Sequence, residues 1–374
     1  MRIGIDASAL VKEAAGIGQW ILQVTQNMME LDSENEYFLF TYDEIRLPFE
    51  LKDNWEIVSY GGKKNRQINF LTTLPLILRE YKIEVFLGTR HYLPPFNRKI
   101  TYVAMVHDLI PLYMPELFTR EHKQRFRFFT ELCRRQADAV IAASNATKKD
   151  ILKYMKLPEE KVKVIYEGAN PMYNAERDED GIRKTMDKYH IDTEYILCLS
   201  TVEPRKNMLR TIQAYEQCLL EKKITQKMVI VGGSGWKNGP IYDYVQEKKL
   251  SDHVIFTGYV ENEEVKHIYA NATLFAYASL CEGFGIPVLE AMQSGVPVIT
   301  SNVSSMPEVA GSACEMVDPY SVCEIKEAML RVLSSKERQE SMRRLGLEQA
   351  AQFSWKKCAR EVWQYMLQAA EKTH

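Results

Sequence analysis

Short apolar runs alternate with longer amphipathic segments along the chain, and this alternation predicts parallel strands separated by helices. The runs of the first half are apolar on both faces, as in strands that helices cover on each side of a sheet. An amphipathic helix is expected over residues 17–31. Strands of a first sheet are expected at residues 3–6, 37–41, 85–87, 102–106, 139–142 and 162–165.

A second set of strands begins after a polar, acidic stretch at residues 174–188, which we interpret as a linker. A chain of 374 residues suits two domains, each with its own core. We expect an α/β fold of two facing Rossmann-like domains with a central cleft. They span residues 1–173 and 189–354, and a last helix over 355–374 crosses back to the first domain. Further strands are expected at 196–199, 228–231, 254–256, 274–277, 298–300 and 314–317.

Composition narrows the function classes. The formal net charge is -2, so overall charge gives no reason to expect a nucleic-acid partner. Asp6 interrupts the first apolar run, which fits a buried strand better than a signal peptide, and no run approaches the roughly 18 apolar residues of a membrane span. The seven cysteines are scattered without a C-x-x-C pair, as expected for reduced thiols. We therefore expect a cytoplasmic protein without a metal site.

The segment from Cys281 to Ala291 has the features of a phosphate-binding turn. It follows an expected strand, its glycines free the backbone for close approach, and Pro287 suits the first turn of a helix. Free N–H groups and the helix dipole at such a turn favour phosphate. Glu282 falls in the loop and Glu290 about one turn inside the helix. These carboxylates suit sugar hydroxyls and a ribose diol. The alternative is an ordinary turn with two surface glutamates.

Two further groups of polar residues follow expected strands. Arg205 and Lys206 stand in a loop before a helix, where positive charge is unfavourable unless an anion is bound. The alternative is a solvated basic turn. His107 and Asp108 follow the expected strand at 102–106. Histidine suits acid–base or polar contact with a substrate, although a lone histidine is often structural. The role of Asp108, as partner or helix cap, stays open.

The run from Glu282 to Ile299 resembles the donor-site signature of retaining GT-B glycosyltransferases of family 4, E-G-F-G-x-P-x-x-E-A-M-x-x-G-x-P-V-I. Similar resemblances are found in E-P-R-K-N at residues 203–207 and in H-D-L-I-P at residues 107–111. The G-I-G-Q-W turn at residues 16–20 resembles the family's G-I-G-R-Y, with Gln19 in place of arginine, and Ser200 stands where some members have a further arginine. The resemblance spans nearly the whole chain.

The resemblance implies roles for individual residues. Glu282 would lie near the donor sugar ring, Glu290 would contact the ribose, and His107 would bond a sugar hydroxyl. Arg205 and Lys206 would neutralise the departing diphosphate. Weaker matches at 232–235, 256–260 and 304–308 would adjoin the donor and its base. The catalytic set is thus His107, Glu282, Arg205 and Lys206, and the binding set is Gly16, Gly18, Gly233, Tyr259, Val260, Gly283, Phe284, Gly285, Ile286 and Glu290.

The implied reaction is transfer of a hexose from a nucleoside diphosphate sugar to a hydroxyl of a glycan or lipid-linked acceptor, with retention and without metal or cofactor. The H-Y-L-P-P and H-D-L-I-P runs at 91–95 and 107–111 are similar to mannosyltransferase-like polysaccharide enzymes, which favours GDP-mannose as donor. Alternatives are an epimerase or phosphorylase of the same fold and a non-catalytic sugar-nucleotide-binding protein. An NAD-dependent oxidoreductase is disfavoured because the first turn lacks G-x-G-x-x-G.

Two segments of the first half mix basic and apolar residues. Residues 61–79 combine Lys63, Lys64 and Arg66 with aliphatic side chains, and residues 119–135 combine six basic residues with three phenylalanines. An ordinary helix with its apolar face in the core is the favoured interpretation. The alternative is peripheral contact with an anionic membrane, at its inner face, that presents a lipid-linked acceptor.

Overall fold

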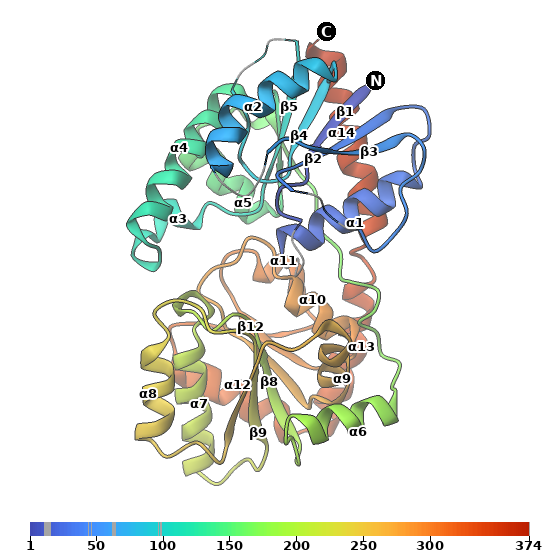
Figure 1. Ribbon diagram of the computed structural model, residues 1–374. Helices are drawn as coiled ribbons and strands as arrows, with labels where there is room; N and C mark the ends of the chain where they lie inside the picture. The colour runs from blue at the N-terminus through green and yellow to red at the C-terminus, as the bar shows by residue number, and fades with distance from the viewer. Residues whose placement is uncertain are drawn as a thin grey trace. The chain divides into compact units, whose positions relative to one another are not determined.

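A computed structural model describes residues 1–10, 16–43, 45, 47–61, 65–95, 97 and 99–373. The chain divides into two compact units, drawn in Figure 1. Unit 1 comprises Met1–Glu167 together with Ser354–His374, and unit 2 comprises Gly168–Phe353. Each unit is built around its own parallel sheet. The sequence therefore predicted the α/β class and the two Rossmann-like halves correctly.

The described residues of unit 1 form a seven-stranded parallel sheet in the order β3-β2-β1-β4-β5-β6-β7. Alternate side chains of each strand face opposite layers of helices, and nearly all are buried, which explains why the strands are apolar on both faces. The strands are β1 (Arg2–Asp6), β2 (Glu36–Thr41), β3 (Trp55–Ser59), β4 (Val85–Gly88), β5 (Thr101–Val106), β6 (Ala139–Ala142) and β7 (Val162–Val164).

Helices cover both faces of this sheet. One face packs against α2 and α4 through Phe70, Leu74, Phe126 and Phe129. On the other face α1 lies along α14, which also contacts β4, β5 and β6 (Figure 1). The helices are α1 (Ile17–Met29), α2 (Arg66–Glu80), α3 (Ile110–Tyr113), α4 (Arg120–Gln136), α5 (Asn145–Asp150) and α14 (Trp355–Thr373), with short turns at Pro115–Leu117, Ile151–Met155 and Glu159–Lys161.

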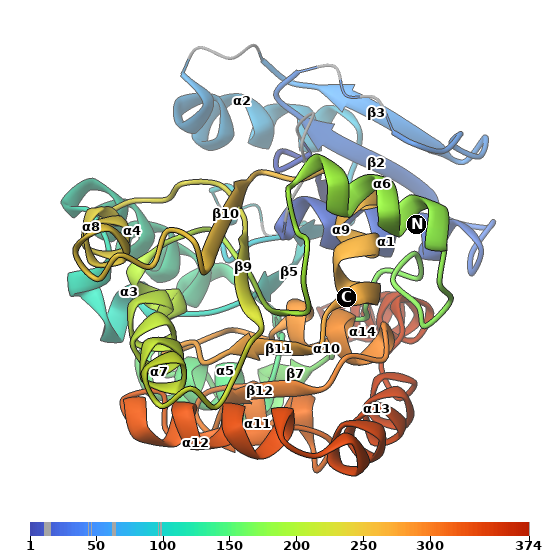
Figure 2. The same cartoon turned by 90° about the horizontal axis from the view of Figure 1, so that it is seen from below.

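Unit 2 contains a six-stranded parallel sheet in the order β10-β9-β8-β11-β12-β13 among its described residues. One face of the sheet packs on α7, α8 and α12, and α7 lies beside α12 (Figure 2). The strands are β8 (Tyr195–Leu199), β9 (Lys227–Val231), β10 (Val254–Gly258), β11 (Leu274–Tyr277), β12 (Val298–Ser301) and β13 (Glu315–Val317). The helices are α6 (Glu179–Lys188), α7 (Met208–Leu220), α8 (Gly239–Glu247), α9 (Asn262–Asn271), α10 (Ile286–Gln293), α11 (Met306–Ala310), α12 (Val322–Leu333) and α13 (Lys336–Ala350).

The prediction that residues 174–188 form a linker is wrong for most of that segment. Most of it is α6, which packs on α9 and buries Ile182 and Met186, and Asp178 caps it by accepting from the Gly181 N–H. The division between the units falls earlier, between Glu167 and Gly168. The last helix, α14, belongs to unit 1, as the sequence predicted.

Each sheet has one place where the strand order reverses direction. In unit 1 this switch point lies between β1 and β4, and in unit 2 it lies between β8 and β11. Loops leave the carboxyl ends of these neighbouring strands in opposite directions, which opens a crevice where open α/β sheets bind ligands. The fold therefore indicates one candidate site in each unit.

Candidate functional site

The switch point of unit 2 brings three of the predicted catalytic residues into direct contact. Arg205 and Lys206 occupy the short 3-10 turn Pro204–Lys206 that follows β8, and Glu282 follows β11. Arg205 Nη1 lies 2.6 Å from Glu282 Oε2, and Lys206 Nζ lies 2.7 Å from Glu282 Oε1. A salt bridge of Arg205 to Glu203 Oε1, at 2.9 Å, completes the group. We call Glu203, Arg205, Lys206 and Glu282 the charged cluster.

The charged cluster is almost fully buried and its formal charges cancel. The Glu282 side chain is 9% exposed and those of Lys206 and Arg205 are 12% and 19% exposed. Burial alone would raise the pKa of Glu282, but Arg205 and Lys206 outweigh it and hold the pKa at about 2. Burial lowers the pKa of Lys206, and Glu282 opposes that shift. Each cation of the charged cluster is therefore paired with a carboxylate in a place that solvent reaches poorly.

Tyr277, at the end of β11, joins the charged cluster from within the sheet, and sequence reasoning had not identified it. Its hydroxyl is 2.6 Å from Lys206 Nζ and 2.9 Å from Glu282 Oε1, and the Lys206 ammonium stands 5.1 Å from the ring centroid. From the sequence alone, an aromatic residue at the end of an apolar strand is interpreted as part of the hydrophobic core. Tyr277 therefore fixes the lysine and the glutamate in one geometry.

The glycine-flanked turn after Glu282 leads into α10 as predicted. Gly285 is the N-cap of α10, and its φ of 114° is a backbone conformation that residues with a side chain rarely adopt, so a substitution there would be strained. Ile286 is the first helical residue and Phe284 is buried. The Ser305 hydroxyl donates to the carbonyl oxygens of Glu282 and Phe284, which ties the predicted 304–308 segment to this turn. Gly283 lies in the same turn.

Glu290 lies one turn inside α10, and among the described residues no cation pairs with it. Tyr269, on α9, has its hydroxyl 3.4 Å from Glu290 Oε2 and 3.3 Å from the Pro287 carbonyl oxygen. Burial raises the pKa of Glu290 to about 8, and the Tyr269 hydrogen bond only partly opposes this. A partly buried carboxylate with a raised pKa and no counter-charge among the described residues is a candidate functional position.

The other predicted donor-site residues lie on loops at the same carboxyl edge of this sheet. Gly233 follows β9, and its carbonyl accepts from the Val202 N–H at 3.0 Å. Tyr259 and Val260 follow β10; Tyr259 is 56% exposed, whereas Val260 is buried. The Tyr259 ring is therefore exposed at this edge of the sheet, whereas Val260 packs into the core.

His107 lies at the carboxyl edge of the unit 1 sheet, directly after β5. Its Nδ1 is 3.0 Å from Glu167 Oε1 and its Nε2 is 3.1 Å from the Thr89 carbonyl oxygen. Both partners offer acceptor oxygens, and the tautomer of the ring decides which nitrogen donates. Sequence reasoning missed Glu167, because 60 residues separate it from His107 and no motif marks it. Glu167 is 4% exposed, so it is a buried carboxylate paired with the histidine.

The glycine turn at the start of α1 approaches the same histidine. Gly16 is the N-cap of α1 with φ 51°, Gly18 is buried, and the Trp20 ring meets the His107 ring edge-on at 5.8 Å. Ala15, part of the predicted turn, lies outside the described residues. Asp108 Oδ1 accepts from the N–H of Ile110, the first residue of α3, whose N-cap is Leu109. His107 belongs to unit 1 and the charged cluster to unit 2.

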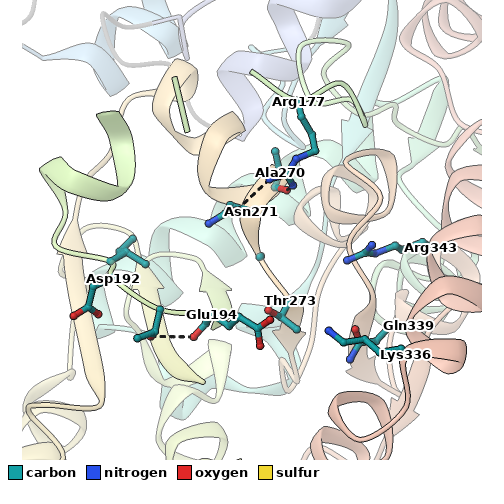
Figure 3. Close-up of a pocket in the computed structure, with 12 residues that line it drawn as sticks. Arg177, Asp192, Glu194, Ala270, Asn271, Thr273, Lys336, Gln339 and Arg343 are labelled. Carbon is teal, nitrogen blue, oxygen red and sulfur yellow. Dashed lines mark hydrogen bonds between the residues drawn. The ribbon is translucent and has the colours of Figure 1, made fainter. Parts of the chain in front are cut away.

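A pocket of about 430 Å³ lies elsewhere in unit 2, near the amino ends of β8 and β11 (Figure 3). Its lining includes Glu194 and Thr273, which precede those strands, whereas the predicted donor residues follow them. Arg177 on its rim is already bonded to the Ala270 carbonyl and to Asn271. The pocket therefore contributes nothing to the charged cluster.

Comparison with known proteins identifies the family. The model of family 4 glycosyltransferases matches residues 16–172, and that of group 1 glycosyl transferases matches residues 182–349. An O-antigen chain mannosyltransferase B of Escherichia coli is 31% identical over 97% of this chain and 98% of its own length. The chain belongs to the family 4 glycosyltransferases. It is accordingly a glycosyltransferase.

Solved structures of low sequence identity share its fold. A sucrose-phosphate synthase from Thermosynechococcus elongatus superposes with a TM-score of 0.78 at 17% identity, covering 98% of both chains. WaaG, a glycosyltransferase involved in lipopolysaccharide biosynthesis, gives 0.74 at 15% identity, covering 97% of this chain and 98% of its own. These likenesses establish the GT-B fold.

Two further observations bear on cofactors and membranes. Within the described ranges, no group of three or more His, Cys, Asp or Glu side chains is placed to hold a metal ion. No helix in the described part of the chain has the length and apolar character to cross a bilayer.

Proposed function

We propose that this glycosyltransferase moves mannose from GDP-mannose, with retention of anomeric configuration, to a hydroxyl of a glycan or lipid-linked acceptor in surface-polysaccharide synthesis. The 31% identity to O-antigen chain mannosyltransferase B over nearly the whole of both chains supports the sugar and the process. The charged cluster at the unit 2 switch point supports the nucleotide-sugar donor. The alternative function, a non-catalytic sugar-nucleotide-binding protein, does not account for the His107–Glu167 pair.

The observation on which the proposal rests is the pairing of Glu282 with both Arg205 and Lys206. In the free chain Glu282 occupies the place of an anion between the two cations. A donor diphosphate brings stronger acceptors to the same cations and displaces the carboxylate. Glu282 is then released beside the sugar, where it can accept hydrogen bonds from hydroxyl groups.

The proposed transfer breaks the bond between the sugar C1 and the β-phosphate oxygen and forms a bond from C1 to the acceptor oxygen. The acceptor's proton passes to the departing diphosphate. Arg205 and Lys206 stabilise the charge that grows on the leaving group, in a place that water reaches poorly. Because these cations and the α10 N-terminus supply positive potential, we propose that the reaction needs no metal ion and no cofactor.

In this proposal His107 contacts the donor sugar while Glu167 holds its ring. A sugar hydroxyl replaces the Thr89 carbonyl at Nε2, and the bond from Nδ1 to Glu167 stays in place. The Glu167 carboxylate accepts from Nδ1 and so fixes the orientation of the ring, which leaves Nε2 to meet the sugar hydroxyl.

Glu290 and the loop after β10 would hold the nucleoside. The Glu290 carboxyl group has no counter-charge among the described residues, so two ribose hydroxyls would supply the hydrogen bonds that Tyr269 only partly provides. Tyr259 would lie against the base, because its ring is the exposed aromatic group of that loop. Gly233 and the Gly16–Gly18 turn would allow the phosphates to approach the backbone.

Thermal denaturation of the purified chain with GDP, UDP and CDP tests the donor assignment. A nucleotide at 100 times its dissociation constant adds about 2.7 kcal/mol of stability. We expect GDP to raise the melting temperature of wild type but not of Lys206→Ala. Lys227→Ala, which removes the ion pair of the partly buried Lys227 with the exposed Asp192, is the matched control and should keep the full shift. Lack of a shift with every nucleotide would contradict the proposal.

We also propose that unit 1 contacts an anionic membrane, at its inner face for a cytoplasmic chain, where a lipid-linked acceptor is presented. Three large apolar side chains are exposed on α2 and α4, namely Ile68 at 57%, Leu76 at 68% and Phe128 at 52%. Arg125 and Arg127 are exposed next to Phe128 in the sequence. The two helices pack together through the Phe70 and Phe129 rings and appear on one side of the unit 1 sheet in Figure 1. Lys63 and Lys64 lie outside the described residues.

Liposome sedimentation with a matched pair of double variants tests this contact. Each basic residue near an anionic surface contributes about 1 kcal/mol, so Arg125→Gln with Arg127→Gln should weaken binding about 30-fold. Arg134→Gln with Arg135→Gln makes the same charge change on the same helix, where both arginines pair with Glu131, and should bind almost as wild type. Equal recovery of all three proteins with and without liposomes would overturn the proposal.

A further inference from the structure

The pocket at the amino ends of β8 and β11 lies within unit 2, at the edge of the sheet opposite the charged cluster. Its volume of about 430 Å³ falls in the range of roughly 300–1,000 Å³ that small-molecule sites occupy. Glu194 and Thr273 precede the two strands, and α13 supplies another wall through Lys336, Gln339 and Arg343 (Figure 3). None of the predicted donor residues is among the described residues that line it. The proposed transfer reaction therefore gives this cavity no use.

Two buried polar side chains of the pocket lining have an atom that no protein group satisfies. Thr273 is 8% exposed, and its hydroxyl has no hydrogen-bond partner in the part of the chain that the structure describes. Gln339 is 3% exposed, and its Nε2 donates to the Val332 and Leu333 carbonyl oxygens. No described group donates to Gln339 Oε1. Because native proteins leave few buried polar groups unpaired, both atoms fit a place where a polar ligand binds.

The wall that α13 supplies is positively charged. Lys336, Gln339 and Arg343 are spaced by three and four residues, so they lie along one side of the helix. Lys336 has no ion-pair partner among the described residues, and the carboxylate paired with Arg343, that of Glu340, is 3.9 Å away. Lys336 is also the first residue of α13, where the helix dipole favours an anion. The two cations are therefore available to an anionic group.

The wall formed by residues 192–194 is acidic, and its carboxylates already have partners. Asp192 Oδ1 accepts from Lys227 Nζ at 2.8 Å. Glu194 Oε2 accepts from Gln226 Nε2 at 2.9 Å. Each carboxylate has a second oxygen that can accept from a hydroxyl group, whereas both would repel a phosphate. The pocket thus has one side that suits an anion and another that suits hydroxyl groups.

This distribution of charge and polar atoms selects the kind of ligand. Inorganic phosphate alone would satisfy the two cations but not the Thr273 hydroxyl or Gln339 Oε1. A nucleoside diphosphate would bring a further negative charge toward the acidic wall. A hexose monophosphate carries one anionic group for the cations and several hydroxyl groups for the remaining polar atoms.

We propose that this pocket binds a hexose monophosphate, with the phosphate between Lys336 and Arg343 and the sugar hydroxyls against Thr273, Gln339 and Glu194. The Thr273 hydroxyl and Glu194 accept or donate according to the sugar hydroxyl that they meet, and Gln339 Oε1 accepts. The site is separate from the donor site, and it does not depend on the proposed function.

Calorimetric titration with D-mannose 6-phosphate and D-glucose 6-phosphate tests the site. The double variant Lys336→Gln with Arg343→Gln should weaken binding about 10- to 100-fold, because it removes both charged partners of the phosphate. Arg338→Gln with Arg344→Gln makes the same charge change on the same helix and is the matched control. These two arginines pair with glutamates that do not line the pocket, so the control should bind as wild type does.

Thr273→Val separates contact with the sugar from contact with the phosphate. Valine keeps the branched shape and lacks the hydroxyl, so hexose phosphates should bind about 2- to 10-fold more weakly while binding of inorganic phosphate is unchanged. Inorganic phosphate that binds wild type as tightly as the hexose phosphates would overturn the assignment of a sugar. An equal loss of both ligands in Thr273→Val would contradict it as well.

Lys206→Ala shows whether the ligand occupies this pocket or the charged cluster. We expect this variant to bind both hexose phosphates as wild type does, because Lys206 lies at the other edge of the sheet. Loss of binding in Lys206→Ala would place the ligand at the charged cluster and overturn the site. So would equal binding by wild type and the double variant of Lys336 and Arg343, or no binding of either hexose phosphate by wild type.

Discussion

Replacing Glu290 by glutamine should stabilise the free chain at alkaline pH. Burial raises the pKa of this carboxyl group from 4.5 to about 8, so the folded chain holds a proton that the unfolded chain has released. The protonated Glu290 carboxyl group therefore contributes fully to the stability of the folded chain below pH 4.5. This contribution is lost progressively as the pH rises toward 8. From the unfolded pKa to pH 7.5 is about three pH units, and the free energy of unfolding falls by about 1.4 kcal/mol for each of them. The total loss is up to about 4 kcal/mol. Glutamine keeps the shape and cannot ionise.

Urea denaturation of wild type and Glu290→Gln at pH 5 and pH 8 measures the effect, with Glu247→Gln on α8 as an exposed control. We expect the two unfolding free energies to differ little at pH 5. At pH 8 the Glu290 variant should be several kcal/mol more stable, while the control follows wild type at both values. The same variant should lose GDP binding. An unchanged difference between pH 5 and pH 8 would refute the view that Glu290 is partly buried without a counter-charge.

Further predictions concern the charged cluster and the histidine. Glu282→Gln should lower activity at least tenfold and, unlike a surface change, destabilise the chain by about 3 kcal/mol, because Lys206 loses its carboxylate partner and Arg205 keeps only Glu203. A transfer assay measures the activity and urea denaturation measures the stability. Because the Glu282 pKa is lowered to about 2, wild type should lose this contribution as pH falls from 4.5 toward 2, whereas Glu282→Gln should show no such loss. Glu167→Gln should lower kcat on the order of tenfold with the donor KM unchanged, because His107 keeps a hydrogen-bond partner but loses the carboxylate that orients its ring. An equal rise in KM would contradict that positioning role.

The elements that the sequence predicted are those whose apolar pattern is strong. The buried strands were found because nearly every side chain of a strand covered on both faces is apolar. The final helix was found because its apolar residues recur at helical spacing. The edge strand β3, Trp55–Ser59, was missed, because it is short and mixes buried Trp55 with exposed Glu56. The helix α6 was taken for a linker, because its exposed acidic face hides the three buried positions that dock it on α9.

The candidate site was likewise predicted only in part. The residues within motifs, such as Glu282 and Arg205, were identified because consecutive residues of one loop share a function. Glu167 and Tyr277 were not, because each acts through a partner that only the sheet brings near, from a loop or a strand with an unremarkable sequence.

The measurement that tests the central claim most directly is the anomeric configuration of a product. The chain is incubated with GDP-mannose and octyl α-D-mannopyranoside, and the one-bond carbon–hydrogen coupling at the new anomeric centre is measured by NMR. The proposed reaction predicts an α-linked disaccharide in wild type and none with Lys206→Ala. A β-linked product would contradict retention. Binding of GDP-mannose with neither transfer nor hydrolysis would contradict catalysis and favour a sugar-nucleotide-binding protein.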